Sequence, residues 1–196
     1  MRVTFCLCLA LLAAPALSHD YEEVEVTGRR TNLVGEAVSA SQGVVGQEEL
    51  LVRPILRVGE VLETVPGMVV TQHSGGGKAN QYFLRGFNLD HGTDFRTSYD
   101  GMPVNMRSHG HGQGYTDINF VIPELLQSIE YKKGPYYAEV GDFSGAGSAN
   151  FTTLGRLDQN IVELGVGEDQ FGRLLAAGST RLGSGDLLLG LDTQVY

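Results

Sequence analysis

Histidines concentrate in glycine-rich stretches of this chain, in patterns that could bind a metal ion. His109 and His111 flank a single glycine, and His91 lies between two aspartates in the run 90–94. Imidazole and carboxylate groups suit zinc, copper and iron. In an extended loop, alternate residues point to the same side, so both rings of a His-x-His pair can face one ligand. We predict a site for a metal or a metal-bearing molecule, formed by His73, His91, Asp94, His109 and His111.

The same residues have a simpler explanation. Glycine, histidine, asparagine and serine are common in exposed loops, where they suit turn geometry and solubility without binding a ligand. Both interpretations predict that these histidines lie in surface loops. They differ in whether the rings converge on one point.

Common enzyme motifs are absent from the sequence. It contains neither a Gly-x-Ser-x-Gly nucleophile elbow nor a His-Glu-x-x-His zinc motif. Gly77-Lys78 resembles the end of a phosphate-binding loop, but Gln72 replaces the required glycine and no serine or threonine follows. A secreted metallohydrolase built on His91, His109, His111 and Asp94 stays as a minor alternative. We expect no enzymatic activity and no resident cofactor.

Residues 1–18 are typical of an export signal. Arg2 supplies the positive charge, an apolar run follows it, and residues 16–18 place small side chains around a cleavage site. Both cysteines of the chain, Cys6 and Cys8, lie inside this segment. The mature protein would therefore have no disulfide and no thiolate metal site. The net charge of -9 argues against nucleic-acid binding, which favours a basic surface.

Residues 48–154 predict a small domain of short helices and strands. Apolar residues at helical spacing follow Pro54 and predict a helix that ends at Pro66-Gly67. Pro123 predicts the start of a second short helix. Strands are expected at residues 68–71, 80–85, 95–99 and 128–132, and the small polar residues of 31–47 predict a linker.

The pattern changes after residue 154. Val162, Leu164 and Val166 share one face of a predicted strand, and the run 187–195 alternates in the same way. Strands of about ten residues, apolar on one face and joined by short turns, are typical of a transmembrane β-barrel. A half-buried soluble sheet would show the same period. Three such strands cannot close a barrel, which needs about eight, so we expect a fragment of a longer protein.

Four short runs occur in a fixed order behind the export signal. They are 61–67, ending in Val-Pro-Gly; 84–87, Leu-Arg-Gly-Phe; 99–104, Tyr-Asp-Gly-Met-Pro-Val; and 128–135, ending in Lys-Lys-Gly-Pro. Together they resemble the plug domain of TonB-dependent outer-membrane receptors, although the family usually has Arg-Gly-Pro in the last run. The resemblance implies an α+β plug domain with a small mixed sheet over 48–154. The truncated start of an antiparallel transmembrane β-barrel would follow over 155–196.

An alternating segment near the N-terminus fits the same family. Glu23, Val24, Glu25, Val26 and Thr27 form a short extended run before a glycine. Such a run can add a strand to the edge of another protein's sheet. It resembles the TonB box, the peptide that these receptors present to TonB in the periplasm, and residues 19–47 would then comprise the box and a linker. A first strand or a loose tail is the alternative.

The resemblance also implies compartment, partners and mechanism. The protein would lie in the outer membrane in contact with its lipid, bind cargo from outside, and be driven by TonB pulling on the box. The family's usual cargo is a ferric chelate, cobalamin, a bare metal or a carbohydrate, and the sequence does not choose among them. With the histidine loops in view, we expect a siderophore-type metal chelate or a metal ion. A module that senses or binds cargo without transporting it is the alternative.

Charged residues of the plug are expected to form ion pairs with the lumen of the barrel. Through the resemblance, Arg85, Arg96 and Glu130 would form a latch that transport must release, with Glu60 and Glu63 nearby. Breaking a buried ion pair is costly, which is what a latch requires.

Overall fold

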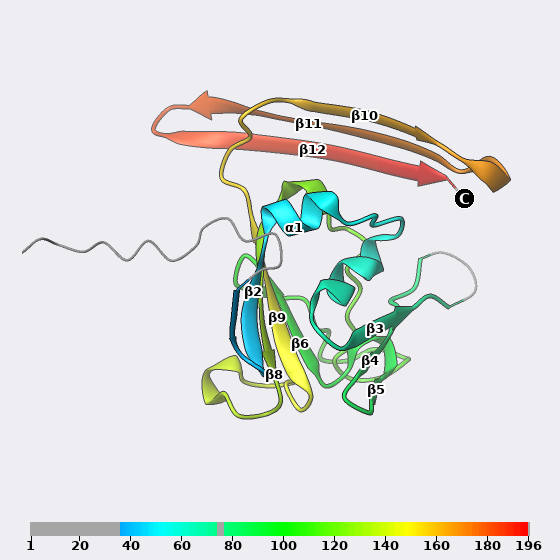
Figure 1. Ribbon diagram of the computed structural model, residues 1–196, viewed down its shortest axis with the longest axis vertical. Coiled ribbons are helices and arrows are strands. Elements are labelled where there is room, and N and C mark those ends of the chain that lie inside the picture. The colour runs from blue at the N-terminus through cyan, green and yellow to red at the C-terminus, as the bar shows by residue number, and fades with distance from the viewer. Residues whose placement is uncertain (1–35, 74–76, 196) are drawn as a thin grey trace, which may run out of the picture.

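The computed structural model describes residues 36–73 and 77–195 of the chain. The predicted export signal, residues 1–18, and the predicted TonB box, residues 23–27, lie outside the described residues. The described part contains one six-stranded sheet and two three-stranded sheets (Figure 1). None of its helices is long and apolar enough to cross a membrane.

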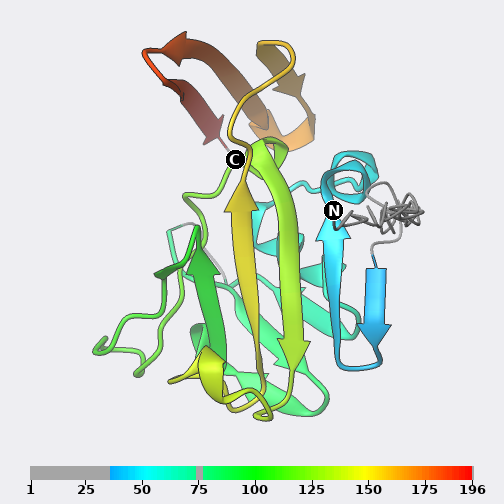
Figure 2. The same cartoon turned by 90° about the vertical axis from the view of Figure 1, so that its left-hand side faces the viewer.

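The six-stranded sheet has the order β1-β2-β8-β9-β6-β7, with β9 parallel to β6 and all other neighbours antiparallel. Figure 2 shows β9 between its two neighbours. The sheet is therefore mixed, as expected. Its strands are β1 Glu36–Ser39, β2 Gln42–Gly46, β6 Phe95–Tyr99, β7 Met102–Pro103, β8 Leu126–Lys133 and β9 Gly147–Thr153.

Strand alternation gives this sheet one apolar and one polar face. Ile129 and Phe151 are directly paired and fully buried in the main core. Glu130 and Asn150, the neighbouring pair of these antiparallel strands, lie on the opposite face. The apolar face packs against residues from other elements of the plug, including Leu62 and Tyr82.

Two predictions for the first part of the domain are wrong. The expected linker holds β1 and β2, which join the large sheet. The expected helix from Pro54 to Val65 is replaced by an earlier helix, α1 Gln47–Val52, and a 3₁₀ helix, η1 Val58–Thr64. The Glu60 carboxylate accepts hydrogen bonds from the backbone N–H groups of Leu56 and Arg57, at 3.0 and 3.2 Å. This cap begins η1 at Val58 rather than at Pro54.

The second sheet is formed by β3 Met68–Thr71, β4 Gln81–Leu84 and β5 Phe87–Leu89. Its first two strands confirm the predictions for 68–71 and 80–85. Arg85 and Gly86 join β4 to β5 with φ of 50° and 85°, the left-handed pair that a two-residue hairpin turn requires. Asp100 and Gly101 do the same between β6 and β7, with φ of 48° and 79°.

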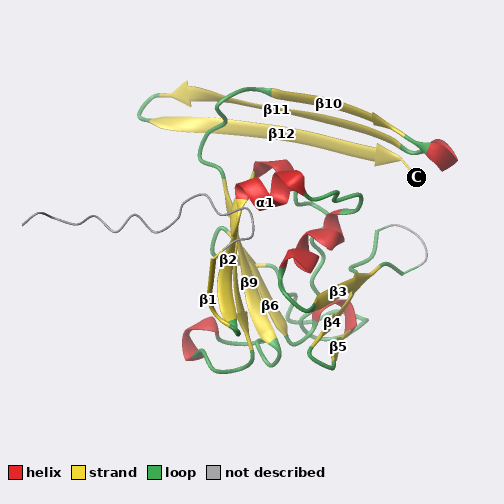
Figure 3. Cartoon of the chain, viewed as in Figure 1, coloured by secondary structure: helices red, strands yellow, loops and turns green. Residues whose placement is uncertain are grey.

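The third sheet consists of β10 Ile161–Val166, β11 Gly172–Leu182 and β12 Gly185–Val195, antiparallel in chain order. It lies across one end of the plug (Figure 3). Val162, Leu164 and Leu189 are among its strongly exposed apolar side chains. The opposite face packs on the plug through a small cluster built on Leu125 of η3 Pro123–Leu125, Leu157 and Ala177 of β11. These strands confirm the predicted start of a barrel.

Gly147 allows β9 to begin beside β8. Its φ is 150°, and a Cβ atom there would lie 3.0 Å from the Cα of Lys133 and closer still to the Lys132 carbonyl oxygen. We expect Gly147→Ala to lower the free energy of unfolding by about 2 kcal/mol, because both the backbone conformation and the contact are unfavourable for alanine. Urea unfolding in detergent measures the change. Gly155→Ala is the matched control, since its Cβ would have open space; equal losses in both variants would contradict the steric explanation.

Candidate functional site

Four of the predicted site residues, all histidines, come together in one cluster. The ring centroids of His73 and His91 are 4.5 Å apart, those of His91 and His111 4.8 Å, and those of His109 and His111 5.1 Å. The rings come from three separate stretches of chain, and whether they bind a metal or a metal-bearing molecule stays a prediction.

Asp90, rather than the predicted Asp94, lies with two of these histidines in a group that could hold a metal ion. One ligand atom from each of His73, Asp90 and His91 lies within 4.8 Å of the others. Asp94 has φ of 60°, and its side chain lies beside Gly145, while its carbonyl oxygen accepts a hydrogen bond from the Ala146 N–H. Sequence spacing could not distinguish two aspartates of one short loop, because the choice depends on the backbone turn between them.

Buried backbone groups hold the cluster in place. The Ala79 carbonyl oxygen lies 2.8 Å from His91 Nδ1, and the Ala79 N–H donates to the Tyr115 hydroxyl at 2.8 Å. The Thr116 N–H donates to the His91 carbonyl oxygen at 2.8 Å. His109 stacks on the Tyr115 ring, with centroids 3.8 Å apart. Ala79, His91 and Tyr115 are each less than 7% exposed, so these contacts form a rigid base under the rings.

Asn105 joins the loops that carry the cluster. Its side-chain N–H groups face the carbonyl oxygens of Phe95 and Gly114, both at 3.0 Å, and the Thr116 hydroxyl at 2.7 Å. Its amide oxygen accepts the Thr97 N–H at 2.7 Å. Asn105 is 7% exposed. One buried amide therefore joins β6 to the end of the loop that carries His109 and His111. The sequence alone did not reveal this role.

Local conformation brings Asp90 and His91 together. They lie in the short 3₁₀ helix η2 Asp90–Gly92, where His91 has a left-handed φ of 53°. Gly92 follows with φ of 87°, and a Cβ on it would lie 2.6 Å from the Thr116 Cβ. Consecutive left-handed residues are sparsely populated outside turns and often mark functional sites. The Asp90 carboxylate lies 3.7 Å from His91 Nε2.

The electrostatic environment favours neutral imidazole at His111. Desolvation lowers its pKa first, and the positive charge that His91, His109 and Lys78 can carry lowers it further, while Asp90 partly opposes them. A neutral ring is the form that coordinates metal ions.

The three predicted latch residues make contacts within the plug. Arg85 donates to the Ala40 carbonyl oxygen at 3.0 Å and to the Ser41 hydroxyl at 3.3 Å. Glu130 pairs with Lys132 at 3.6 Å, and both line a recess with Arg96 on the polar face of the large sheet. Glu60 caps η1 as described above, and the Glu63 carboxylate accepts the Val70 N–H at 2.9 Å. Pairing of Arg85, Arg96 and Glu130 with a barrel lumen stays a prediction.

A different ion cluster joins the plug to the third sheet. Arg173 of β11 binds Glu124 of η3 through two hydrogen bonds, at 2.6 and 2.9 Å, and Asp192 of β12 at 2.7 Å. The three side chains are 11, 19 and 12% exposed. Sequence analysis missed this cluster. The available signal was an arginine and an aspartate on the polar face of neighbouring strands.

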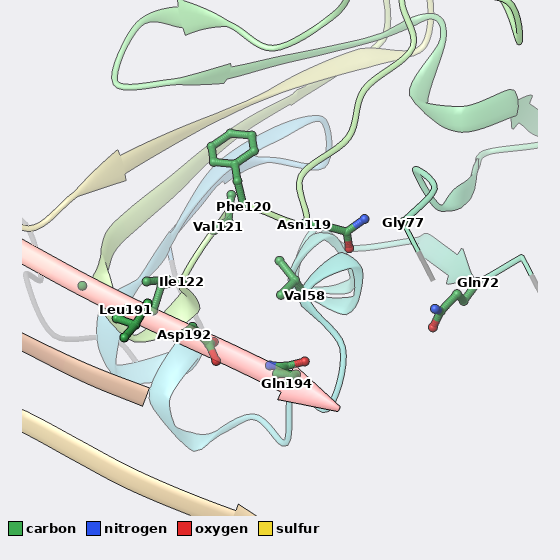
Figure 4. A pocket seen from close by; sticks show the side chains of 11 residues that line it. Val58, Gln72, Gly77, Asn119, Phe120, Val121, Ile122, Leu191, Asp192 and Gln194 are labelled. Carbon is green, nitrogen blue, oxygen red and sulfur yellow. The ribbon is translucent and has the colours of Figure 1, made fainter. Parts of the chain in front are cut away.

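A pocket of about 430 Å³ separates β12 from the plug beside this ion cluster (Figure 4). Phe120 and Ile122 line one side, and Leu191 and Asp192 of β12 line the other. Asp192 thus faces both Arg173 and an open space. The plug and β12 are not continuously packed at this point.

Comparison with known proteins supports the fold. Residues 35–148 match the family model described as the TonB-dependent Receptor Plug Domain. The Vitamin B12 transporter BtuB of Vibrio vulnificus (strain CMCP6) is 29% identical over 150 residues, which cover 76% of this chain and 23% of that protein. The chain therefore spans less than a quarter of this relative's length.

Two solved structures show the same fold. The siderophore receptor PirA from Acinetobacter baumannii superposes with a TM-score of 0.53 at 21% identity, over 72% of this chain and 22% of the receptor chain. The copper transporter OprC superposes with a TM-score of 0.59 at 18% identity, over 82% of this chain and 24% of the transporter chain. These relatives are named as transporters or receptors.

Proposed function

Because the chain belongs to the TonB-dependent receptor plug domain family, we propose that it is the plug-bearing part of an outer-membrane receptor for a metal-bearing cargo. The cargo class is a siderophore-type chelate or a metal ion. The cluster of four histidine rings, each beside at least one other, is the observation that carries this choice. Histidines that served only loop solubility would have no reason to stack on a buried, hydrogen-bonded base.

The position of the cluster fits cargo arriving from outside. Strands β3 to β5, which carry the loops of His73 and His91, lie on the right of Figure 1, on the side of the connection between β10 and β11. That connection is longer than the one between β11 and β12, and in outer-membrane barrels the longer connections lie outside the cell. The β1–β2 end of the plug lies on the left, where the chain enters the described fold. If the TonB box lies on the side of the plug opposite the cargo site, cargo binding can change TonB binding only through a change in the plug between them.

The Arg173 cluster is the proposed latch. Cargo binding would alter the plug, and TonB would then pair with residues 23–27 and pull. Movement of the plug away from β11 and β12 must separate Glu124 from Arg173. The pocket beside Asp192 lets water reach the separating charges, which lowers the cost of breaking the contact.

TonB binding tests the receptor assignment. We expect the chain to bind the periplasmic domain of TonB. Val24→Pro should raise the dissociation constant by at least about tenfold, because proline removes a backbone donor from the added strand. Val24→Ile keeps that donor and should bind like the wild type. Titration calorimetry in detergent compares the three proteins.

Absence of TonB binding by the wild-type chain, or equal binding by all three proteins, would contradict the proposed use of residues 23–27. A cargo-sensing module without transport would bind cargo but show no TonB-dependent accumulation in cells. Uptake of radioactive metal by cells that carry the full-length receptor, with and without TonB, distinguishes the two functions.

A further inference from the structure

We propose that the histidine cluster binds a bare divalent transition-metal ion of the zinc or copper(II) class directly. Its ligands are His91 Nε2, an Asp90 carboxylate oxygen and His73 Nδ1, with His111 as the fourth. This inference rests on the proposed function and narrows its cargo to the ion rather than a chelate.

The hydrogen bond of the His91 ring leaves its Nε2 free to bind a metal ion. Nδ1 lies 2.8 Å from the Ala79 carbonyl oxygen, which can only accept, so Nδ1 carries the proton. Nε2 therefore presents a lone pair on the side of Asp90, 3.7 Å away. A ring held through its second nitrogen by a backbone carbonyl is the usual support of a metal-binding histidine. His91 is 5% exposed, so this orientation is fixed before any ion binds.

His73 is oriented by the same logic. Its Nε2 lies 3.3 Å from the Gln81 amide oxygen, which accepts a hydrogen bond from the ring N–H. The Gln81 amide nitrogen donates to Asn88, which fixes the direction of the Gln81 amide. Nδ1 of His73 is then the nitrogen with a free lone pair. His73 and His91 stack with centroids 4.5 Å apart, and one ligand atom from each ring lies within 4.8 Å of the other and of Asp90.

His109 has a positioning role rather than a ligand role. Its Nδ1 accepts the backbone N–H of His111 at 3.2 Å, and its ring stacks on Tyr115. These contacts occupy one nitrogen and hold the backbone of His111. The His111 ring lies 4.8 Å from that of His91 and is exposed, so rotation of this one side chain can bring a fourth ligand to the ion.

The separations need only a small adjustment. Zinc binds histidine nitrogen and carboxylate oxygen at about 2.0–2.2 Å, so ligands across an ion are about 4 Å apart at most. The three ligand atoms here lie within 4.8 Å of one another. The Asp90 side chain is 57% exposed and can rotate toward the two rings to close the difference.

The donor set selects the type of cargo. Three imidazoles and one carboxylate suit zinc or copper(II), whereas magnesium and calcium prefer oxygen ligands. A ferric chelate whose coordination positions are all filled by its own oxygens has no position for an imidazole. Imidazole rings whose nitrogen lone pairs are free can therefore bind an ion that has open coordination positions.

Titration of the untagged chain in detergent with Zn²⁺ and with Cu²⁺ tests the proposal. We expect one saturable site, and Asp90→Asn and His111→Ala should each weaken binding at least about tenfold. Asp94→Asn is the matched control, because it changes an aspartate of the same loop that lies outside the group; it should bind within about twofold of the wild type. The Cu²⁺ electron paramagnetic resonance spectrum should show coupling to ring nitrogens, reduced in His111→Ala.

No saturable ion binding by the wild type, or equal weakening by Asp90→Asn and Asp94→Asn, would overturn the proposal. Ferric citrate is titrated in parallel. Chelate binding without ion binding would overturn the bare-ion inference and keep the proposed metal-bearing cargo. Absence of TonB binding by the wild-type chain in the separate box experiment would instead contradict the receptor function, so the two failures are distinguishable.

Discussion

Replacing Arg173 with methionine is expected to lower the free energy of unfolding by about 3 kcal/mol, the lower end of the cost of breaking a buried ion pair. Methionine keeps much of the apolar volume but removes the charge between Glu124 and Asp192. Two carboxylates that are less than 20% exposed would then face each other without a cation. Urea unfolding of the chain in detergent, followed by circular dichroism, measures the loss.

Two further variants identify the cause of that loss. Arg181→Met changes an exposed arginine of the same strand and should cost no more than about 0.5 kcal/mol. Adding Glu124→Gln and Asp192→Asn to Arg173→Met should restore most of the stability, since the one carboxylate of the cluster that keeps its charge, Glu163, is half exposed to solvent. If Arg173→Met were no worse than Arg181→Met, the ion cluster would not hold the plug to the barrel strands.

Asn105→Ala is expected to cost about 3 kcal/mol, because several buried backbone groups lose a side-chain partner at once. The carbonyl oxygens of Phe95 and Gly114 and the Thr97 N–H all bond to this amide. The loops under the histidine cluster should loosen together. We expect faster amide hydrogen exchange there and a lower unfolding midpoint.

Asn105→Asp separates hydrogen-bond donation from simple occupancy of the site. The carboxylate can still accept the Thr97 N–H but repels the carbonyl oxygens, so it should be nearly as destabilising as alanine. Asn119→Ala, which removes a more exposed bond to the Lys78 carbonyl oxygen, is the control and should cost about 0.5 kcal/mol. Similar losses in Asn105→Ala and Asn119→Ala would contradict the central role of Asn105.

Turn preferences and strand alternation predicted the parts of this fold that depend only on residues close together in the chain. The Asp100-Gly101 turn follows from the left-handed conformations that these residues tolerate, and the alternation of β10 and β12 follows from one apolar face. In contrast, β9 was not predicted as a strand. Its small residues resembled a loop, and only pairing with β6 and β8 makes them a central strand.

The sequence predicted only part of the candidate site, because the rest depends on backbone conformation and on contacts between distant residues. The histidine types and their loops were visible in the sequence, but the choice of Asp90 over Asp94 depends on left-handed backbone at His91. The Asn105 hub and the Arg173 cluster depend on contacts between residues far apart in the chain. Such contacts leave no periodic signal in a single sequence.

The order of strands in the large sheet also has a consequence for how the protein is made. β2 pairs with β8, and β6 pairs with β9, so strands that lie early in the chain wait for partners that are synthesised much later. Sheets closed by such distant segments form slowly. The central sheet of the plug cannot be completed until residue 153 is available, so this sheet stays open while most of the chain is being made. A chain with this topology is suited to threading through a narrow translocation channel before it folds.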